Sequence, residues 1–597
     1  MASEVGKYSV YDPRIVQTKP KYAVEKGALS LTNVSFQAQT ADSTSCQFNV
    51  QVPSENVFVD RAVEWAGQVC ATVTVLLTAP AGLAIPANTS LQGLVAPAAF
   101  PLHQSVSQMS ATINDATVTV NTQDVLPQVL RLADMRDARR QRTCPTMLDR
   151  YAVMPDSSVV QNSPLLSWAQ TTESDSVPNG GFNGFYFATS ALGNTPQPFS
   201  GAGTPTGGAG GTSPGTVSYL NGQPFLTAAL DATETRVLTF FVVVASVEKL
   251  LLPPFIFSDQ HELSTGLFGV QNFQVQMNIA PTPKRSFRVA TSKTVESSVG
   301  TVCAPFSDPT AVWSSSNFAG LWVSKPSLAV QFLTPSLDIP LPPKSIVPYM
   351  EFPRYITSPG TTVPQSANYL SASTPLVSQT ITLPNIPDLL VIYVKPAAYT
   401  DVTQGDWSLP ITSIALNFDN FSGLLSTMTQ EQLYQMSLRN GVDMDWSEWS
   451  GLGVVPSATG LNATTNVLSI VGGGQRGLVG GPLVLRPGRD FALQAGQAPG
   501  LVGNFTLQYT INVQNFTGAE QAAVNVYTVP ISSGFFETIK GSSRIIKGVL
   551  TEQDILSAPA SAPASDLERP VGAARPGSMS MSKSHMGGAR SSMSAYM

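Results

Sequence analysis

Short runs of alternating or continuous apolar residues recur along the whole chain. They are bounded by Pro, Gly, Asn and Ser, a pattern typical of β-strands separated by turns. Clear examples lie at residues 47–52 (QFNVQV), 70–77 (CATVTVLL), 116–120 (ATVTV), 273–279 (FQVQMNI), 389–394 (LLVIYV), 482–488 (PLVLRPG) and 505–513 (FTLQYTINV). The longest apolar run, Val237–Val247, is too short to span a bilayer and is rich in β-branched and aromatic residues. The pattern predicts an all-β protein.

A helical period is rare in this sequence, and its best example covers residues 429–440. Thr429 is a typical N-cap, Leu433 and Met436 lie on one helical face, and Asn440 followed by Gly441 is a stop signal. Helices are therefore expected to be short accessories to the sheets.

Two pairs of matching segments indicate an internal duplication. TQDVLPQ at Thr122–Gln128 matches TQEQLYQ at Thr429–Gln435, and GLFGVQNFQVQ at Gly266–Gln276 matches GLVGNFTLQ at Gly500–Gln508 when two residues are gapped. The pairs occur in the same order, which predicts two tandem copies of one β unit. Pro127 is expected to disrupt the first copy's helix, because proline lacks the backbone N–H that a helix interior needs.

The first copy is longer than the second between these landmarks. They lie 138 residues apart in the first copy, from Gln128 to Gly266, and 65 apart in the second, from Gln435 to Gly500. The extra residues, about 73 by this count, include the Gly/Ser/Thr/Pro-rich stretch 178–215, which has the composition of a long exposed loop. We expect a surface insert in the first copy at about 178–225; a Gly-rich linker between domains is the alternative.

The segment after the last strand-like run, 526–536, has a different composition. An Ala/Ser/Pro tract at 557–565 is followed by a tail that contains Arg575, Lys583, His585 and Arg590 and no acid after Glu568. A flexible, weakly basic tail is expected there, with a specific interaction motif as the alternative.

Charged residues make up only 12% of the 597-residue chain, about half of the roughly 25% found in ordinary soluble domains. The formal net charge of −6 argues against a chain that coats nucleic acid over its whole surface, since phosphate binding needs a local surplus of Lys and Arg. The 4 cysteines are far apart and the N-terminus lacks the apolar core of a signal peptide, which predicts a reducing compartment and no secretion.

Candidate catalytic groups are few. The chain has 3 histidines, His103, His261 and His585, and no H-E-x-x-H, G-x-S-x-G or Walker A pattern, so structural or surface roles are favoured for them. The stretch Gly472–Gly477 (GGGQRG) formally satisfies G-x-G-x-x-G. It is followed by Pro482 and more glycines instead of the helix that a dinucleotide site needs, which predicts a loop between strands.

Two charged clusters have more than one interpretation. The acids Asp443, Asp445 and Glu448 beside Trp446 and Trp449 could form a cation site or a carboxylate pair of the glycosidase type, but a packed turn with its acids facing water is favoured.

A second cluster interleaves five arginines with two acids, which favours an ion-pair patch at least as much as a phosphate site. Its members are Arg131, Asp134, Arg136, Asp137, Arg139, Arg140 and Arg142.

Several segments resemble the major capsid proteins of polinton-like viruses and virophages. They are PSENVFVDRAVEW (53–65), LLPPFIFSDQHELSTGLFGVQNFQV (251–275), LPNIPDLLVIYVKP (383–396), TMTQEQLYQMSLRNGVDMDWSEWSG (427–451) and SSRIIKGVLTEQDI (542–555). The likeness spans about residues 45–555 and is carried by several segments in the right order. More remotely, the family is similar to adenovirus hexon and tectivirus coat proteins.

The resemblance implies a double jelly roll, with two eight-stranded jelly rolls side by side and a long Gly/Ser/Pro-rich loop in the first. It also implies a homotrimer of pseudo-hexagonal outline that tiles an icosahedral shell around a DNA genome. Neighbouring capsomers, penton proteins and minor capsid proteins are the expected partners, and loops between strands are expected to form outward towers.

We therefore expect a non-enzymatic structural protein of the virion. No catalytic, cofactor-binding or metal residue, no membrane span and no sequence-specific binding of nucleic acid are expected, although the basic tail could touch the genome loosely. The expected division is an N-terminal arm (1–40), a first roll (41–295), a second roll (296–545) and a C-terminal segment (546–597). The alternative is a carbohydrate-binding or carbohydrate-active β-sandwich protein whose site would be the acids around Trp446 and Trp449.

Overall fold

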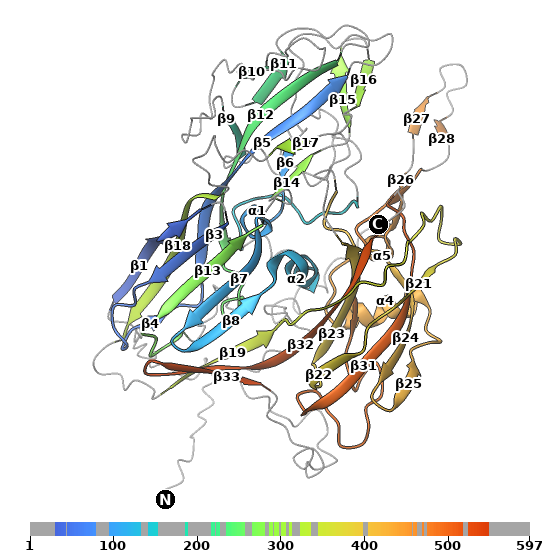
Figure 1. The fold of residues 1–597 in the computed structure, drawn as a ribbon. Helices are drawn as coiled ribbons and strands as arrows, with labels where there is room; N and C mark the ends of the chain where they lie inside the picture. Colours follow the sequence, from blue (N-terminus) through green and yellow to red (C-terminus); the bar gives the residue numbers. More distant parts are fainter. Residues whose placement is uncertain are drawn as a thin grey trace, which may run out of the picture.

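The chain folds into two pairs of β-sheets that lie side by side in the computed structural model (Figure 1). The structure describes residues 30–42, 44–78, 95–132, 141–152, 185–188, 217–220, 223–226, 235–256, 266–280, 286–289, 292–297, 300–305, 310–312, 323–335, 344–397, 404–455, 458–461, 468–470, 474–517 and 523–547.

The first sheet pair contains a five-stranded and a seven-stranded antiparallel sheet. The five-stranded sheet has the order β2 (Thr40–Ala41), β3 (Ser45–Val50), β13 (Phe273–Ile279), β7 (Val106–Ile113) and β8 (Ala116–Val120). The seven-stranded sheet has the order β1 (Ser30–Gln37), β18 (Val323–Thr334), β5 (Glu64–Thr78), β12 (Thr235–Lys249) and β9 (Phe185–Ala188), with β4 (Phe58–Val59) beside β18 and β17 (Thr310–Val312) beside β5.

The second sheet pair contains a six-stranded and a five-stranded antiparallel sheet. The six-stranded sheet has the order β19 (Ser345–Glu351), β32 (Val524–Ile539), β23 (Leu389–Pro396) and β30 (Leu483–Leu485), with β20 (Tyr355–Thr357) and β33 (Ser542–Lys547) also beside β32. The five-stranded sheet has the order β21 (Thr374–Val377), β31 (Val502–Val513), β24 (Ile411–Phe418) and β25 (Phe421–Leu424), with β22 (Ile381–Asn385) beside β31.

Short hairpins and helices complete the described chain. The two-stranded sheets are β6 (Val95–Pro97) with β14 (Phe287–Val289), β10 (Val217–Leu220) with β11 (Gln223–Leu226), β15 (Ser292–Ser297) with β16 (Gly300–Pro305), β26 (Leu452–Val455) with β29 (Gly474–Gly477), and β27 (Ala458–Leu461) with β28 (Leu468–Ile470). The helices are α1 (Pro101–Gln104), α2 (Thr122–Val129) with a 3₁₀ turn (Leu130–Leu132), α4 (Gln430–Arg439) and α5 (Trp446–Ser450).

Period-two burial explains why these segments form sheets. In β13 the side chains from Phe273 to Ile279 alternate between the interior and the surface, so one face of the sheet packs on its partner sheet. The apolar run at 237–247 lies in a strand, β12, which pairs with β5 over the whole length of both strands.

The strand order confirms the internal duplication. The order β3-β13-β7-β8 in the first sheet pair corresponds to β22-β31-β24-β25 in the second, and β18-β5-β12 corresponds to β32-β23-β30. The matching segments fall on corresponding elements, since α2 follows β8 and α4 follows β25, while the Gly266 and Gly500 segments lead into β13 and β31.

The two equivalent helices differ at the position of the proline. α2 passes through Pro127 and ends two residues later, whereas α4 continues from its N-cap Thr429 to a C-cap at the predicted Asn440. The expectation that Pro127 disrupts the helix is thus too strong. It shortens the helix, and burial of most of α2 on both sides compensates for the missing backbone hydrogen bond.

The strand pairing does not coincide with the expected division of the chain. β18 lies beyond the expected boundary at 295/296, yet it pairs with β1 and β5 of the first sheet pair. β1 lies inside the expected N-terminal arm, yet it is a strand of the same sheet. Both pairings join residues that are far apart in the sequence, so local pattern could not indicate them.

The two ends of the molecule differ (Figure 1). The hairpins β10-β11 and β15-β16 rise above the first sheet pair, and β27-β28 rises above the second at the same end; β33 lies at the opposite end. Of the predicted 178–215 insert, residues 185–188 form β9 beside β12, and the rest lies outside the described residues, as does the tail from residue 548. Within the described chain, none of the helices has the length and apolar character needed to cross a membrane.

Candidate functional site at the junction of the two sheet pairs

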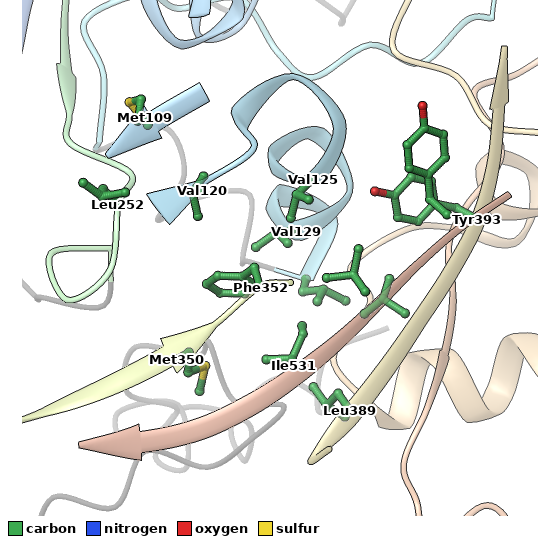
Figure 2. Packing of buried hydrophobic residues seen from close by; sticks show 14 of the residues in the cluster. Met109, Val120, Val125, Val129, Leu252, Met350, Phe352, Leu389, Tyr393 and Ile531 are labelled. Carbon is green, nitrogen blue, oxygen red and sulfur yellow. The ribbon is translucent and has the colours of Figure 1, made fainter. Parts of the chain in front are cut away.

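Helix α2 lies between the two sheet pairs and packs on both. Val125 and Val129, one helical turn apart, lie close to Phe352 and to Ile531 of β32 (Figure 2). The next positions, Leu126 and Leu130, pack instead with Phe100 and Leu251 of the first half. The helix therefore fills the space between the sheet pairs with apolar side chains on two faces.

The apolar core continues across the junction without a break. Met109, Val120 and Leu252 of the first half belong to the same buried cluster as Met350 and Leu389 of the second (Figure 2). A rotation of one sheet pair against the other would expose this surface, and each such side chain contributes about 1.5–3 kcal/mol when fully buried. The shared core fixes the angle between the two halves.

A buried polar cluster lies beside this core, and we call it the junction clamp. Asp149 accepts hydrogen bonds from Arg288 Nε at 3.0 Å, from Arg288 Nη2 at 2.6 Å and from the backbone N–H of Asp406 at 2.9 Å. Asp406 in turn accepts from Gln104 Nε2 at 2.6 Å and lies 3.4 Å from Arg288 Nη2. Asp149, Arg288 and Asp406 are all buried, so these charge-assisted bonds join the halves in a low-dielectric setting.

The segment that follows Asp149 forms backbone hydrogen bonds with the second half. The N–H of Val479 donates to Arg150 O at 3.0 Å, and the N–H of Gly405 donates to Ala152 O at 3.0 Å. A Cβ on Gly405 would lie 2.6 Å from Tyr151 O, so this close backbone approach requires glycine. The segment from Asp149 to Ala152 is therefore part of the junction.

Helix α2 also makes polar contacts with the second half. Asp124 forms an ion pair with Arg354, and its carbonyl accepts a hydrogen bond from Tyr393 Oη at 2.8 Å. The Tyr393 ring stacks on Tyr527 with a centroid separation of 5.3 Å. These contacts orient the helix on the sheet formed by β23 and β32.

A three-stranded ribbon crosses from the second sheet pair to lie beneath the first (Figure 1). It consists of β19, the C-terminal half of β32 and β33, and we call it the connecting ribbon. At its far end Gly541 N–H donates to Gly269 O at 2.8 Å, Asn114 Nδ2 donates to Ser543 Oγ at 2.9 Å, and Asp115 accepts from Ser542 Oγ at 3.0 Å. The ribbon thus ties the base of the first half to the second.

The acid and tryptophan cluster is part of this junction. Arg150 of the first half lies 3.0 Å from an Asp445 carboxylate oxygen and 3.1 Å from one of Glu448. Asp445 caps α5 by accepting the N–H of Glu448 at 2.8 Å. Burial raises the pKa of Glu448, whereas in Asp445 the bonds from Glu448 N–H and Ser447 outweigh burial and lower its pKa.

The structure corrects one expectation about this cluster. Glu448 is buried against Arg150 and does not face water. Trp449 is also buried and donates its indole N–H to Pro482 O at 2.9 Å, while the partly exposed Trp446 packs on Tyr434 and Trp449. Among the described residues no group of three or more His, Cys, Asp or Glu side chains could hold a metal ion.

The other predicted clusters are found at separate places. Arg131 and Arg142 are buried and bond to backbone carbonyls, Arg131 to Asp149 O and Arg142 to Thr146 O, so neither is presented to a phosphate. The remaining members, residues 134, 136, 137, 139 and 140, lie outside the described residues. Gly474–Gly477 forms the strand β29, paired with β26, where the sequence predicted a loop between strands.

His103 is buried in the first half. Its Nδ1 lies 2.5 Å from a Glu248 carboxylate oxygen, and its Nε2 accepts the N–H of Leu251 at 3.2 Å. Both ring nitrogens are thus used within the core, which indicates a structural role. His261 and His585 lie outside the described residues.

Comparison with known proteins identifies the family. The family model for the first domain of the Sputnik virophage major capsid protein matches residues 3–333, more than half of the chain. The chain belongs to this virophage major capsid protein family. The model for the C-terminal domain of major capsid protein V20 matches residues 352–534. The first match ends at residue 333, in β18 of the first sheet pair, and the second begins at residue 352, directly after β19 of the second.

Individual relatives agree with this membership. The putative capsid protein V20 of Sputnik virophage is 23% identical over 566 residues, which are 92% of this chain and 81% of the relative. A chain in the cryo-EM structure of Sputnik virophage superposes with a TM-score of 0.66 at 22% identity, covering 94% of this chain and 97% of that one. The mavirus major capsid protein gives a TM-score of 0.60 at 14% identity, covering 93% and 97%. The fold is the double jelly roll, as the sequence resemblance implies.

The junction clamp predicts a large effect of a single substitution. Asp149→Asn removes the carboxylate that makes the shortest contacts with the buried Arg288 guanidinium, and breaking a buried ion pair typically costs about 3–5 kcal/mol of unfolding free energy. Lys547→Gln is the control, because the Lys547–Glu351 pair is partly exposed and such pairs contribute about 0–1 kcal/mol. Denaturant unfolding of both variants measures the difference, and equal effects would contradict the clamp.

The connecting ribbon predicts a dependence of stability on acid pH. The hydrogen bonds from Ser543 N–H and Ser542 Oγ lower the pKa of Asp115 below the ordinary value for an aspartate. Because the folded pKa is below the unfolded one, this stabilisation is present above the unfolded pKa and is lost as the pH falls through the folded pKa. Unfolding at pH 7 and pH 3 is expected to show a smaller loss of stability at low pH in Asp115→Asn than in the unsubstituted chain. An unchanged pH dependence would show that Asp115 does not hold the ribbon through its charge.

Proposed function

We propose that this capsid protein forms a homotrimer of pseudo-hexagonal outline and that the trimers tile an icosahedral shell around a DNA genome. The observation that carries the proposal is the shared strand order of the two sheet pairs. Three chains with two similar units each present six similar corners, so a threefold object can occupy a hexagonal lattice position. The fixed angle between the two sheet pairs supports the proposal, because six similar corners require the same angle between the two units in every chain.

The composition also supports assembly through many contacts. Charged residues are only 12% of the chain, which reduces the cost of removing charges from water when copies pack together. Assembly then rests on apolar burial and shape fit and needs no cofactor or catalytic residue. Among the described residues, His103, Asp445 and Glu448 have structural partners in the fold, which supports a non-enzymatic role.

The remaining parts of the chain fit the same role. We place the boundary of the two jelly rolls between β18 and β19, and the 178–225 insert as a surface loop of the first roll. Neighbouring capsomers, penton proteins and minor capsid proteins are the partners, and the weakly basic tail after residue 568 contacts the genome loosely. Assembly takes place inside the host cell, without passage through the secretory pathway.

The oligomeric state tests the proposal directly. Light scattering coupled to size exclusion is expected to give a mass about three times the 63.1 kDa of the chain, and particle images are expected to show a hexagonal outline. A monomer at the concentrations used for assembly, or one that cleaves a carbohydrate, would refute the shell function in favour of the β-sandwich alternative.

Limited proteolysis tests the surface insert. Exposed loops rich in small and polar residues are the preferred sites of nicking, so the first cuts are expected within 178–215 while the trimer stays intact. The segment 380–450 contains β22, β23, β24, β25 and α4 and serves as the internal comparison. Early cleavage there, with 178–215 resistant, would contradict the loop assignment.

A further inference from the structure

Two corresponding sheets differ in how their outer faces are covered, where the outer face is the side turned away from the five-stranded sheet of the same half. Every residue of β23 is buried, because alternate side chains such as Leu389 and Tyr393 lie against helix α2 at the junction. β5 is the counterpart of β23 in the first half, and its inner side chains Trp65 and Val69 are buried in the core. Its outer side chains are only half-buried: Glu64, Ala66 and Gln68.

The outer face of the first half extends from β5 over β18 to β1. Directly opposite residues of antiparallel strands share a face, so the register aligns two rows across the three strands. One row consists of Ser35, Ala329 and Glu64, and the other of Gln37, Ser327 and Ala66. Only Glu64 is charged, so few charges lose their water when another chain covers this face.

Helix α4 is the counterpart of α2, but it is covered on fewer sides. The matching segments TQDVLPQ and TQEQLYQ place Glu431 at the position of Asp124 and Gln432 at the position of Val125. Asp124 and Val125 contact the second half across the junction, whereas Glu431 and Gln432 are exposed. The neighbouring Trp446 is 37% exposed as well. The helix positions that α2 buries in the junction therefore lie at the surface in α4.

These two surfaces lie on opposite sides of the molecule. Figure 1 shows β1 and β18 at one side and β24 and β25, the strands that precede α4, at the other. A contact between two different surfaces of identical chains is heterologous, and it closes into a ring when the rotation between copies allows it. In such a ring each copy contributes one surface of each kind.

The charges of the two surfaces are complementary in the same sense as at the junction. Within the chain, Asp124 of α2 pairs with Arg354 of the second half. Glu431 takes the place of Asp124 on α4, and the exposed Lys325 lies at the register shift of β18 beside the outer face. An acid on the helix and a base on the sheet thus recur.

We propose that the junction within each chain is repeated between chains, with α4 of one copy packed on the outer face of β18 and β5 of the next. The inference rests on the proposed homotrimer and identifies the surfaces that form it. Three junctions and three such contacts then alternate around the ring. The contact is more polar than the junction because both surfaces are exposed to water until the copies meet.

Crosslinking between two single-substitution variants tests this contact in isolated trimers. Gln435→Cys lies on the exposed side of α4, and Ala329→Cys lies in the middle of a row on the outer face. When both variants are co-expressed, a short bismaleimide is expected to link two chains on a denaturing gel. Either variant alone is expected to give no linked product, because the contact joins different surfaces. The unsubstituted chain, in which Cys46, Cys70 and Cys144 are buried, gives the background.

Val377→Cys is the matched control for the helix position. Val377 is 52% exposed on β21, at the outer face of the second five-stranded sheet. On the corresponding sheet of the first half, Gln276 of β13 is exposed and takes no part in the junction. Val377→Cys with Ala329→Cys is therefore expected to give no linked product. If Ala329→Cys does not fold, Ser35→Cys in the same row replaces it.

A charged substitution measures the strength of the contact. Ala66→Arg is expected to raise the dissociation constant of the trimer at least about tenfold, because the contact would bury a charge without a partner. Gln276→Arg is the control and is expected to leave the dissociation constant unchanged. Light scattering over a dilution series measures both, and circular dichroism of each variant checks that the chain is folded.

The outcomes separate this inference from the proposed function. A chain that stays monomeric would overturn the homotrimer and the contact together. A stable trimer without a linked product from Gln435→Cys and Ala329→Cys would overturn the contact alone. The same conclusion would follow if Gln435→Cys linked to itself, or if Ala66→Arg and Gln276→Arg weakened the trimer equally.

Discussion

The fixed angle between the two sheet pairs depends on an apolar core that does not stop at the boundary between them. Helix α2 places valines on one side and leucines on the other, so this one helix packs on both halves. Two β-sandwiches joined only by a linker would move independently. Here such movement would expose buried hydrocarbon, and the two halves behave as one body in which each has a set position.

Polar groups add direction to this non-directional packing. Apolar burial favours contact between the two halves but allows several relative orientations. The carboxylate of Asp149 can bond to both Arg288 and the N–H of Asp406 in only one of these orientations. Buried charges cost free energy when they are removed from water, so the junction clamp contributes more to the choice of geometry than to net stability. The apolar core therefore contributes mainly to the stability of the junction, and the junction clamp mainly to the relative orientation of the two halves.

Much of the fold could be predicted from the sequence, but little of the junction. Alternating apolar residues identified the strands, and two short matches identified the duplication because they lie on corresponding helices and strands of the two halves. β18 was assigned to the wrong half because strand pairing across about 300 positions, such as Ser30 with Thr334, cannot be recognised from the local sequence. The clamp residues were missed for the same reason, since 149, 288 and 406 meet only in three dimensions. Asp445 and Glu448 were recognised as a cluster, but their partner Arg150 lies in the other half.

The position of β32 in the chain has a consequence for the order of synthesis. This strand lies inside the six-stranded sheet and also extends beneath the first half, yet among the described strands only β33 follows it in the chain. A nascent polypeptide can complete most of the first sandwich early, but its underside stays open until the ribosome has added the final strands. A chain that ended before β32 would lack the crossing strand and with it the hydrogen bonds that tie the base of the first half to the second. The relative position of the two halves is therefore set only after nearly all the strands of both have been made.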